Sequence, residues 1–177
     1  LYLIFRMDKV EILILRNLLY NEDYLRKVIP FIKADYYEDS NQRIIFEEIE
    51  KFVQEYNQPA TKEVLCIEVE KRQDINDTTF SEITKLISYL EDVPTDYEWL
   101  CDTTEKWCRD RAIYLALMES IALADGKDKD KDRGAIPSIL SNALAVSFDT
   151  NIGHDYLIDY EQRYESYHKK EDLIPFD

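Results

Sequence analysis

Apolar residues recur every three or four positions along most of this chain, a spacing that places them on one face of an α-helix. The pattern predicts helices over residues 9–20, 24–32, 40–56, 62–72, 79–90, 97–124, 136–145 and 155–168. The stretch 62–72 is rich in β-branched residues, which leaves a strand open, although its charged positions fit a helical face better. The predicted fold class is all-α: a globular helical bundle, then a protruding helical hairpin, then a linker helix.

Helix-breaking and loop residues between these elements divide the chain into three expected parts. Residues 1–94 form the bundle, 95–148 the hairpin, and 149–177 a linker segment that contains helix 155–168. The sequence Val93-Pro94-Thr95-Asp96 marks the first boundary, because a helix yields before a proline and Thr95 or Asp96 can cap the next helix. The loop GKDKDKDRG turns the hairpin. Met7 is expected to be the natural start, with residues 1–6 as upstream sequence.

The hairpin carries more apolar surface than two helices need to cover each other. Its first helix would reach roughly 40 Å at 1.5 Å per residue, longer than a compact bundle requires. We therefore expect part of its surface to meet other subunits. The alternative is that the hairpin folds back on the first five helices as ordinary core. The residues of this predicted subunit contact are Trp107, Tyr114, Met118, Ile121, Ile139, Leu140 and Leu144.

Tyrosine is abundant, with 13 residues, and four of them form a row near the end of the chain. Tyr156, Tyr160, Tyr164 and Tyr167 advance by four, four and three positions, so they share one face of helix 155–168. Tyrosine suits contacts that are apolar at one end and wet at the other. The spacing favours a helix that docks in a partner's groove. An ordinary amphipathic helix packed on its own domain has the same pattern and stays open.

Charge and cysteine content narrow the function classes. The net charge of −15 opposes a grip on nucleic acid, which depends on lysines and arginines that displace counterions. Cys66, Cys101 and Cys108 show no pairing pattern, which fits a reducing cytosol. No stretch reaches the ~20 apolar residues that span a bilayer.

No catalytic, cofactor or metal site is predicted. Glu165 and His168 have the E-x-x-H spacing of a metal helix, but His154, the other histidine, has no carboxylate three residues before it. Both histidines lie near the chain end, away from any serine or cysteine pocket. A phosphate-binding G-x-x-x-x-G-K-[ST] loop is also absent, and the chain has only three glycines.

Several stretches resemble the N-terminal region of the DnaB-like replicative helicases of T-even bacteriophages. They are VEILILRNLLYNEDYLRKVIPFIKADYYE at the start, and AIPSILSNALAVSFD, GHDYLIDYEQRYESY and IPF towards the end. The resemblance covers roughly residues 10–176 and is loosest around 66–79 and 126–133.

This resemblance implies an all-helical collar that assembles subunits into a hexameric ring, commonly as a trimer of dimers, and contacts primase. The segment like 154–167 would be the linker helix that docks on the motor of a neighbouring subunit. The parent protein would use ATP and Mg²⁺ to move 5'–3' along DNA in the host cytoplasm. This chain, which stops before the motor, is expected to turn over no ATP and to bind little DNA.

A rival interpretation is an acidic interaction module or DNA mimic unrelated to helicases, which would bind a basic partner through its charge. Its acids should form stripes of one sign. Here they are interleaved with lysine and arginine, which counts against it.

Overall fold

The computed structural model describes residues 2–126 and 132–148, and within these ranges every regular element is helical. The predicted all-α fold class is confirmed. The α-helices are α1 (Tyr2–Tyr20), α2 (Glu22–Val28), α3 (Ser40–Tyr56), α4 (Lys62–Glu70), α5 (Asp77–Tyr89), α6 (Tyr97–Ala124) and α7 (Ile136–Leu144). Two 3-10 turns, η1 (Ala34–Tyr36) and η2 (Arg133–Ala135), precede α3 and α7.

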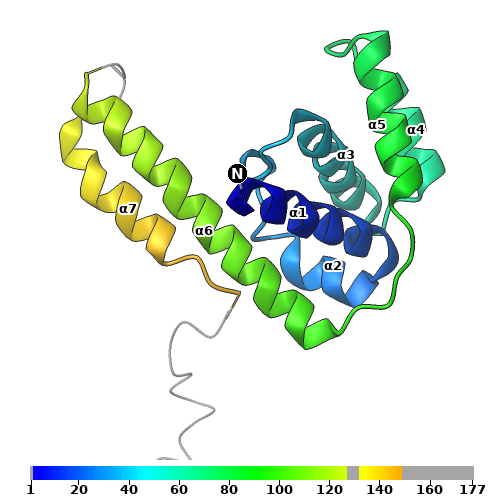
Figure 1. The fold of residues 1–177 in the computed structure, drawn as a ribbon, viewed down its shortest axis with the longest axis horizontal. Helices are drawn as coiled ribbons and strands as arrows, with labels where there is room; N and C mark the ends of the chain where they lie inside the picture. Colours follow the sequence, from blue (N-terminus) through cyan, green and yellow to red (C-terminus); the bar gives the residue numbers. More distant parts are fainter. Residues whose placement is uncertain (1, 127–131, 149–177) are drawn as a thin grey trace, which may run out of the picture.

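The helices form a central group with two projections (Figure 1). Helices α1, α2 and α3 pack together with the first half of α6, while α4 and α5 pack on α3 and on each other at one end. The rest of α6 leaves this group, and α7 runs back along it as the second arm of a hairpin. No helix in the described part of the chain has an apolar run long enough to cross a membrane.

The core lies between α1, α2, α3 and η1 and the first half of α6. Ile14, Leu15 and Leu18 of α1 are fully buried, as are Ile45 and Phe46 of α3. Burial of one such side chain contributes about 1.5–3 kcal/mol. The predicted three-and-four spacing therefore identified the inward faces of these helices correctly.

Side-chain caps fix where several helices begin. Asn21 accepts a hydrogen bond from the Tyr24 N–H at 2.9 Å, and Asn76 accepts one from the Thr79 N–H at 2.8 Å. These caps start α2 and α5 two residues before their predicted beginnings at 24 and 79. The Asp96 carboxylate likewise accepts from the Trp99 N–H at 2.9 Å, as the sequence predicts for the start of α6.

Three other predicted ends were wrong. Helix α1 begins at Tyr2 rather than at residue 9, so the residues before Met7 continue the first helix. Helix α2 ends at Val28 rather than at 32, because Pro30 cannot donate the backbone hydrogen bond that would continue it. The stretch predicted at 62–72 is helical, not a strand, but ends at Glu70.

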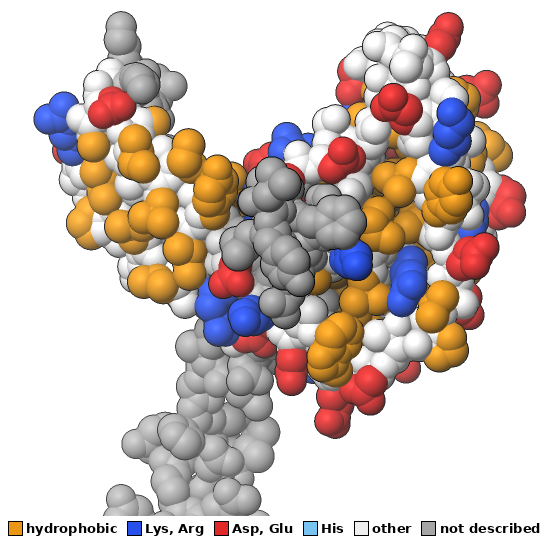
Figure 2. All heavy atoms as spheres, in the orientation of Figure 1, with side chains coloured by type: hydrophobic (Ala, Val, Ile, Leu, Met, Phe, Trp, Pro, Cys, Tyr) orange, Lys and Arg blue, Asp and Glu red, His pale blue; other side chains and the backbone are white. Residues whose placement is uncertain are grey.

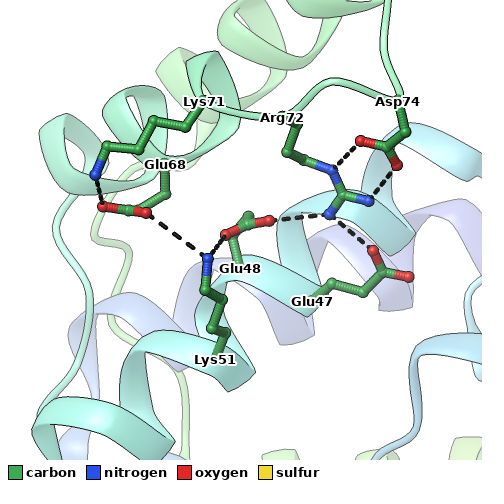
Figure 3. A network of polar contacts seen from close by, with 7 residues as sticks. All are labelled: Glu47, Glu48, Lys51, Glu68, Lys71, Arg72 and Asp74. Atoms are coloured by element: carbon green, nitrogen blue, oxygen red, sulfur yellow. Dashed lines mark hydrogen bonds and ion pairs between the residues drawn. The ribbon is translucent and has the colours of Figure 1, made fainter.

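An ion-pair network fastens α4 to α3 (Figure 3). The Arg72 guanidinium lies 2.9 Å from a carboxylate oxygen of Glu47, 2.9 Å from one of Glu48 and 2.6 Å from one of Asp74. On the other side, Lys51 lies 3.6 Å from Glu48 and 3.9 Å from Glu68. Glu48 is buried, and a buried charge costs several kcal/mol unless it is paired. Arg72 therefore holds a carboxylate of α3 that the fold has taken out of water.

Candidate functional site

Helix α6 passes through two environments along its length. Its first half packs on α1, α2 and η1, and its second half projects with α7 as the hairpin. One apolar stripe runs through both halves, because positions separated by three or four residues share a helical face. The two halves of α6 differ in whether other parts of the chain cover this stripe.

In the first half, the bundle covers the stripe. Trp107 is only 5% exposed; its ring lies 5.1 Å from that of Tyr37 and 6.0 Å from that of Tyr36, measured between centroids. Nearby, the hydroxyls of Tyr24 and Thr104 lie 2.7 Å apart inside the protein. Burial raises the pKa of Tyr24 and Tyr37 well above the usual value of a phenol. These groups stay neutral, as a water-excluding core requires.

Arg111 marks the level at which α6 leaves the bundle. Its guanidinium donates to the Tyr36 carbonyl oxygen at 2.6 Å and forms a short ion pair with Glu38. It also lies over the Tyr114 ring, 5.1 Å from the centroid. A buried arginine needs such partners, because an unpaired charge would be costly there. Arg111 thus joins the covered part of the stripe to the part beyond it.

In the second half, the stripe is exposed. Tyr114, Leu117, Met118 and Ile121 are spaced by three, one and three residues, so they lie together on one side of α6, and each is 47–55% exposed. Figure 2 shows hydrophobic side chains gathered over the hairpin. We call these four residues the hairpin stripe. They make up a contiguous apolar surface of the kind that marks protein–protein contacts.

Helix α7 packs along α6 as the other arm, and its end is tied back to the bundle. Ala112 and Ala116 of α6 line one groove together with Ile139 and Ala143 of α7. After α7, the Phe148 ring stacks on Phe31 with centroids 4.8 Å apart. These contacts hold the base of the hairpin, so the hairpin stripe is presented on a supported helix.

The structure separates the predicted subunit-contact residues into three groups. Tyr114, Met118 and Ile121 are exposed on the hairpin stripe, and Leu144 of α7 is also exposed, at 65%. Ile139 and Leu140 are half-buried and pack against the core. Trp107 requires a correction, because the structure places it in the core of its own chain, where Tyr36 and Tyr37 cover it. The alternative of an ordinary core position therefore fits Trp107.

Sequence reasoning missed one member of the stripe. Leu117 is 47% exposed and lies three residues after Tyr114 and four before Ile121. That spacing is the signal that could have found it.

The predicted linker row of Tyr156, Tyr160, Tyr164 and Tyr167 lies outside the described residues, as do Glu165, His168 and His154. Within residues 2–126 and 132–148, no group of three or more His, Cys, Asp or Glu side chains is placed to hold a metal ion.

The fold and this surface define an all-helical protein with an apolar hairpin face available for contact with another protein. No protein-family model matches the chain. It is similar to a curated replicative helicase, the DnaB-like replicative helicase of Enterobacteria phage T4, with 35% identity over 175 residues. That match covers 94% of this chain and 36% of the relative, so the chain spans about a third of the relative's length. The resemblance to the helicases of T-even phages is confirmed.

Proposed function

We propose that this chain is the subunit-assembly part of a phage replicative helicase, and that the hairpin stripe joins one copy to another. The observation that carries the proposal is the exposure of Tyr114, Leu117, Met118 and Ile121 along one side of α6. The similarity to a DnaB-like replicative helicase supports the wider role in DNA replication.

The chemistry of the hairpin stripe favours a second copy of this chain as its partner. The chain has a net charge of −15, so two copies approaching through charged faces would repel each other. The four stripe residues are uncharged at neutral pH, so pairing two stripes brings no carboxylates of the stripe together. A contact of one helix face with its own copy is also the self-complementary arrangement that two-fold symmetry requires.

The activity of the whole helicase enters the proposal only through the similarity. A protein of this kind would use ATP and Mg²⁺ to move 5'–3' along DNA as a hexameric ring, with this region as its N-terminal collar. Primase would contact the collar, and the row from Tyr156 to Tyr167 would dock on a neighbouring motor. The chain alone is proposed to turn over no ATP, so hydrolysis above background by residues 1–177 would contradict that part.

The assembly proposal is tested by the association of matched variants. Ile121 in the hairpin stripe is 55% exposed, and Ile67 on α4 is 52% exposed, so Ile121→Glu and Ile67→Glu make the same change at equally exposed helical positions. We expect sedimentation velocity to show self-association of the unmodified chain. Ile121→Glu should weaken it by on the order of 10-fold or more, since a 1.4 kcal/mol loss changes affinity tenfold.

The Ile67→Glu control should associate like the unmodified chain. If the unmodified chain is still monomeric at about 100 μM, the proposal is overturned. Its dissociation constant would then lie above that concentration, which is far too weak an affinity for a stable oligomer. Equal loss of association in both variants would also overturn it, because the effect would then be one of charge and not of the hairpin stripe.

A further inference from the structure

A second exposed surface lies away from the hairpin stripe, along the connection between α5 and α6. Residues 89–99 carry four acidic side chains and no basic one. The same run carries large apolar side chains that are exposed to solvent: Tyr89, Val93, Tyr97 and Trp99. Exposed tyrosine and tryptophan side chains grouped on one short segment are typical of contact surfaces, where these residue types are enriched.

This connection forms one wall of a groove of about 380 Å³. Val93 and Pro94 stand on that wall, and Tyr20 at the end of α1 lines the same groove. The walls are held in place from both sides. The Tyr20 hydroxyl donates to the Leu90 carbonyl at 3.0 Å, and Arg16 donates to the Thr95 hydroxyl at 3.4 Å. We call this feature the acidic groove.

The rim of the acidic groove is negative. Glu22 and Asp23 lie at the start of α2, and Asp92 of the connection lines the same groove. Glu22 is paired with Arg26 at 2.6 Å, whereas Asp23 and Asp92 have no ion-pair or hydrogen-bond partner in the described part of the chain. Placement at a helix start explains the acids of α2, since they balance its dipole. It does not explain Asp92, which belongs to no helix.

Two positive side chains near the groove contact neutral groups. Arg16 is the donor to Thr95, and the Lys27 ammonium lies over the Tyr97 ring, 5.8 Å from its centroid. Neither forms an ion pair with Asp23 or Asp92 among the described residues. The acidic groove therefore offers an apolar wall, of Tyr20, Val93 and Pro94, beside two unpaired carboxylates.

We propose that the acidic groove binds a basic segment of another protein, one that places a lysine or arginine next to an apolar residue. The aliphatic stem of the basic side chain would lie against Tyr20 and Val93, and its charged end would reach Asp23 and Asp92. Charge complementarity selects this occupant. A second copy of this chain, at net charge −15, and nucleic acid both carry the wrong sign.

The test uses the complete chain and synthetic peptides as probes. A ten-residue peptide of alternating lysine and leucine stands for the basic apolar segment, and peptides of lysine with serine and of glutamate with leucine are the controls. Titration calorimetry measures the binding of each peptide to the unmodified chain and to the double variant Asp23→Asn/Asp92→Asn, called the groove variant. The matched variant is Asp77→Asn/Asp110→Asn, which removes the same charge from an exposed helix start and an exposed helix surface.

The lysine–leucine peptide is expected to bind the groove variant at least 10-fold more weakly than it binds the unmodified chain. Its affinity for the matched variant should lie within twofold of its affinity for the unmodified chain. Val93→Ser should weaken the lysine–leucine peptide but leave the lysine–serine peptide unchanged. Equal weakening in the two double variants would overturn the proposal, because binding would then follow total charge. Comparable binding of the glutamate–leucine peptide would overturn it as well.

This inference is separable from the assembly proposal. The same titrations in the Ile121→Glu background should give the same affinities, because the acidic groove and the hairpin stripe share no residue. If self-association is lost and peptide binding is intact, the groove proposal still holds. If peptide binding fails but the unmodified chain self-associates through the hairpin stripe, the assembly proposal still holds.

Discussion

The two halves of α6 carry the same kind of apolar stripe and end in opposite environments. Trp107 in the first half is sealed by Tyr36 and Tyr37, whereas Tyr114, only two turns further on, is half exposed. The helix itself does not change between them. What changes is the neighbour: in the described part of the chain, η1, α1 and α2 pack on α6 at the bundle, and α7 and η2 accompany it in the hairpin.

The comparison shows that an apolar face and the covering of that face are separate properties. A stripe is set by spacing along one helix, but its burial depends on which other elements reach it. For the second half of α6, the described part of the chain supplies no cover on the stripe side, so a second molecule can supply it. The following experiments test that division, beginning with the largest expected effect.

Removing Trp107 should destabilise the fold strongly. We expect Trp107→Ala to lower the free energy of unfolding by about 3–5 kcal/mol, the range for a large aromatic deleted from a core. Trp99 is the matched control, because it lies on the same helix but is 54% exposed; Trp99→Ala should cost less than about 1 kcal/mol. Urea unfolding followed by circular dichroism measures both. Similar decreases in the free energy of unfolding at the two positions would contradict the difference between a covered and an exposed site on α6.

Loss of Arg111 should act at the junction between the two halves. Arg111→Met removes the hydrogen bond to the Tyr36 carbonyl and the ion pair with Glu38. We expect about 1.5–3 kcal/mol of destabilisation, typical of hydrogen bonds to a charged group.

The exposed Lys106, also on α6, is the control, and Lys106→Met should change stability by no more than about 0.5 kcal/mol. Equilibrium unfolding compares the two variants. An Arg111→Met protein as stable as the unmodified chain would mean that the junction does not depend on this contact.

Acid should weaken the bundle and leave the hairpin stripe unaffected. The Arg72 guanidinium holds the pKa of Asp74 below its usual value of 3.8. A carboxylate with a lowered folded-state pKa stabilises the fold above its unfolded-state pKa, and this contribution is lost as the pH falls through the lower folded-state value. Stability should therefore fall as the pH drops below about 4.

Arg72→Gln should flatten this acid dependence, and Arg26→Gln, which alters an exposed pair on α2, should not. The measurement is the urea midpoint between pH 3 and 6. The hairpin stripe has no carboxylate to titrate, so self-association measured over the same range where the fold persists should change less than stability does. Steeper acid dependence in Arg72→Gln than in the unmodified chain would contradict the role of the ion pair.

Much of this architecture could be predicted from the sequence because it is local. Spacing identified the helices through α7, and the Val93-Pro94-Thr95-Asp96 sequence placed the start of α6 at its observed residue. Some of the errors at helix ends have local causes as well. Caps at Asn21 and Asn76 started two helices earlier than their apolar positions suggested.

The candidate site was only partly predictable, because the exposure of its residues depends on parts of the chain that are far apart in the sequence. Tyr114, Met118 and Ile121 were recognised as apolar positions on one face, and the structure finds them exposed. Trp107 obeyed the same rule and was assigned to the same surface, but residues some 70 positions earlier in the chain cover it. No periodicity within α6 carries that information.

The sequence by itself determined that the described part of this chain is helical, roughly where the helices α1 to α7 lie, and which side of each is apolar. Only the tertiary structure decided where along α6 the bundle stops and the free apolar face begins, and that Asp92 and Asp23 line the same groove. Helix formation and its apolar face depend on residues three or four apart, whereas covering a face or shaping a groove depends on elements that meet only when the chain has folded.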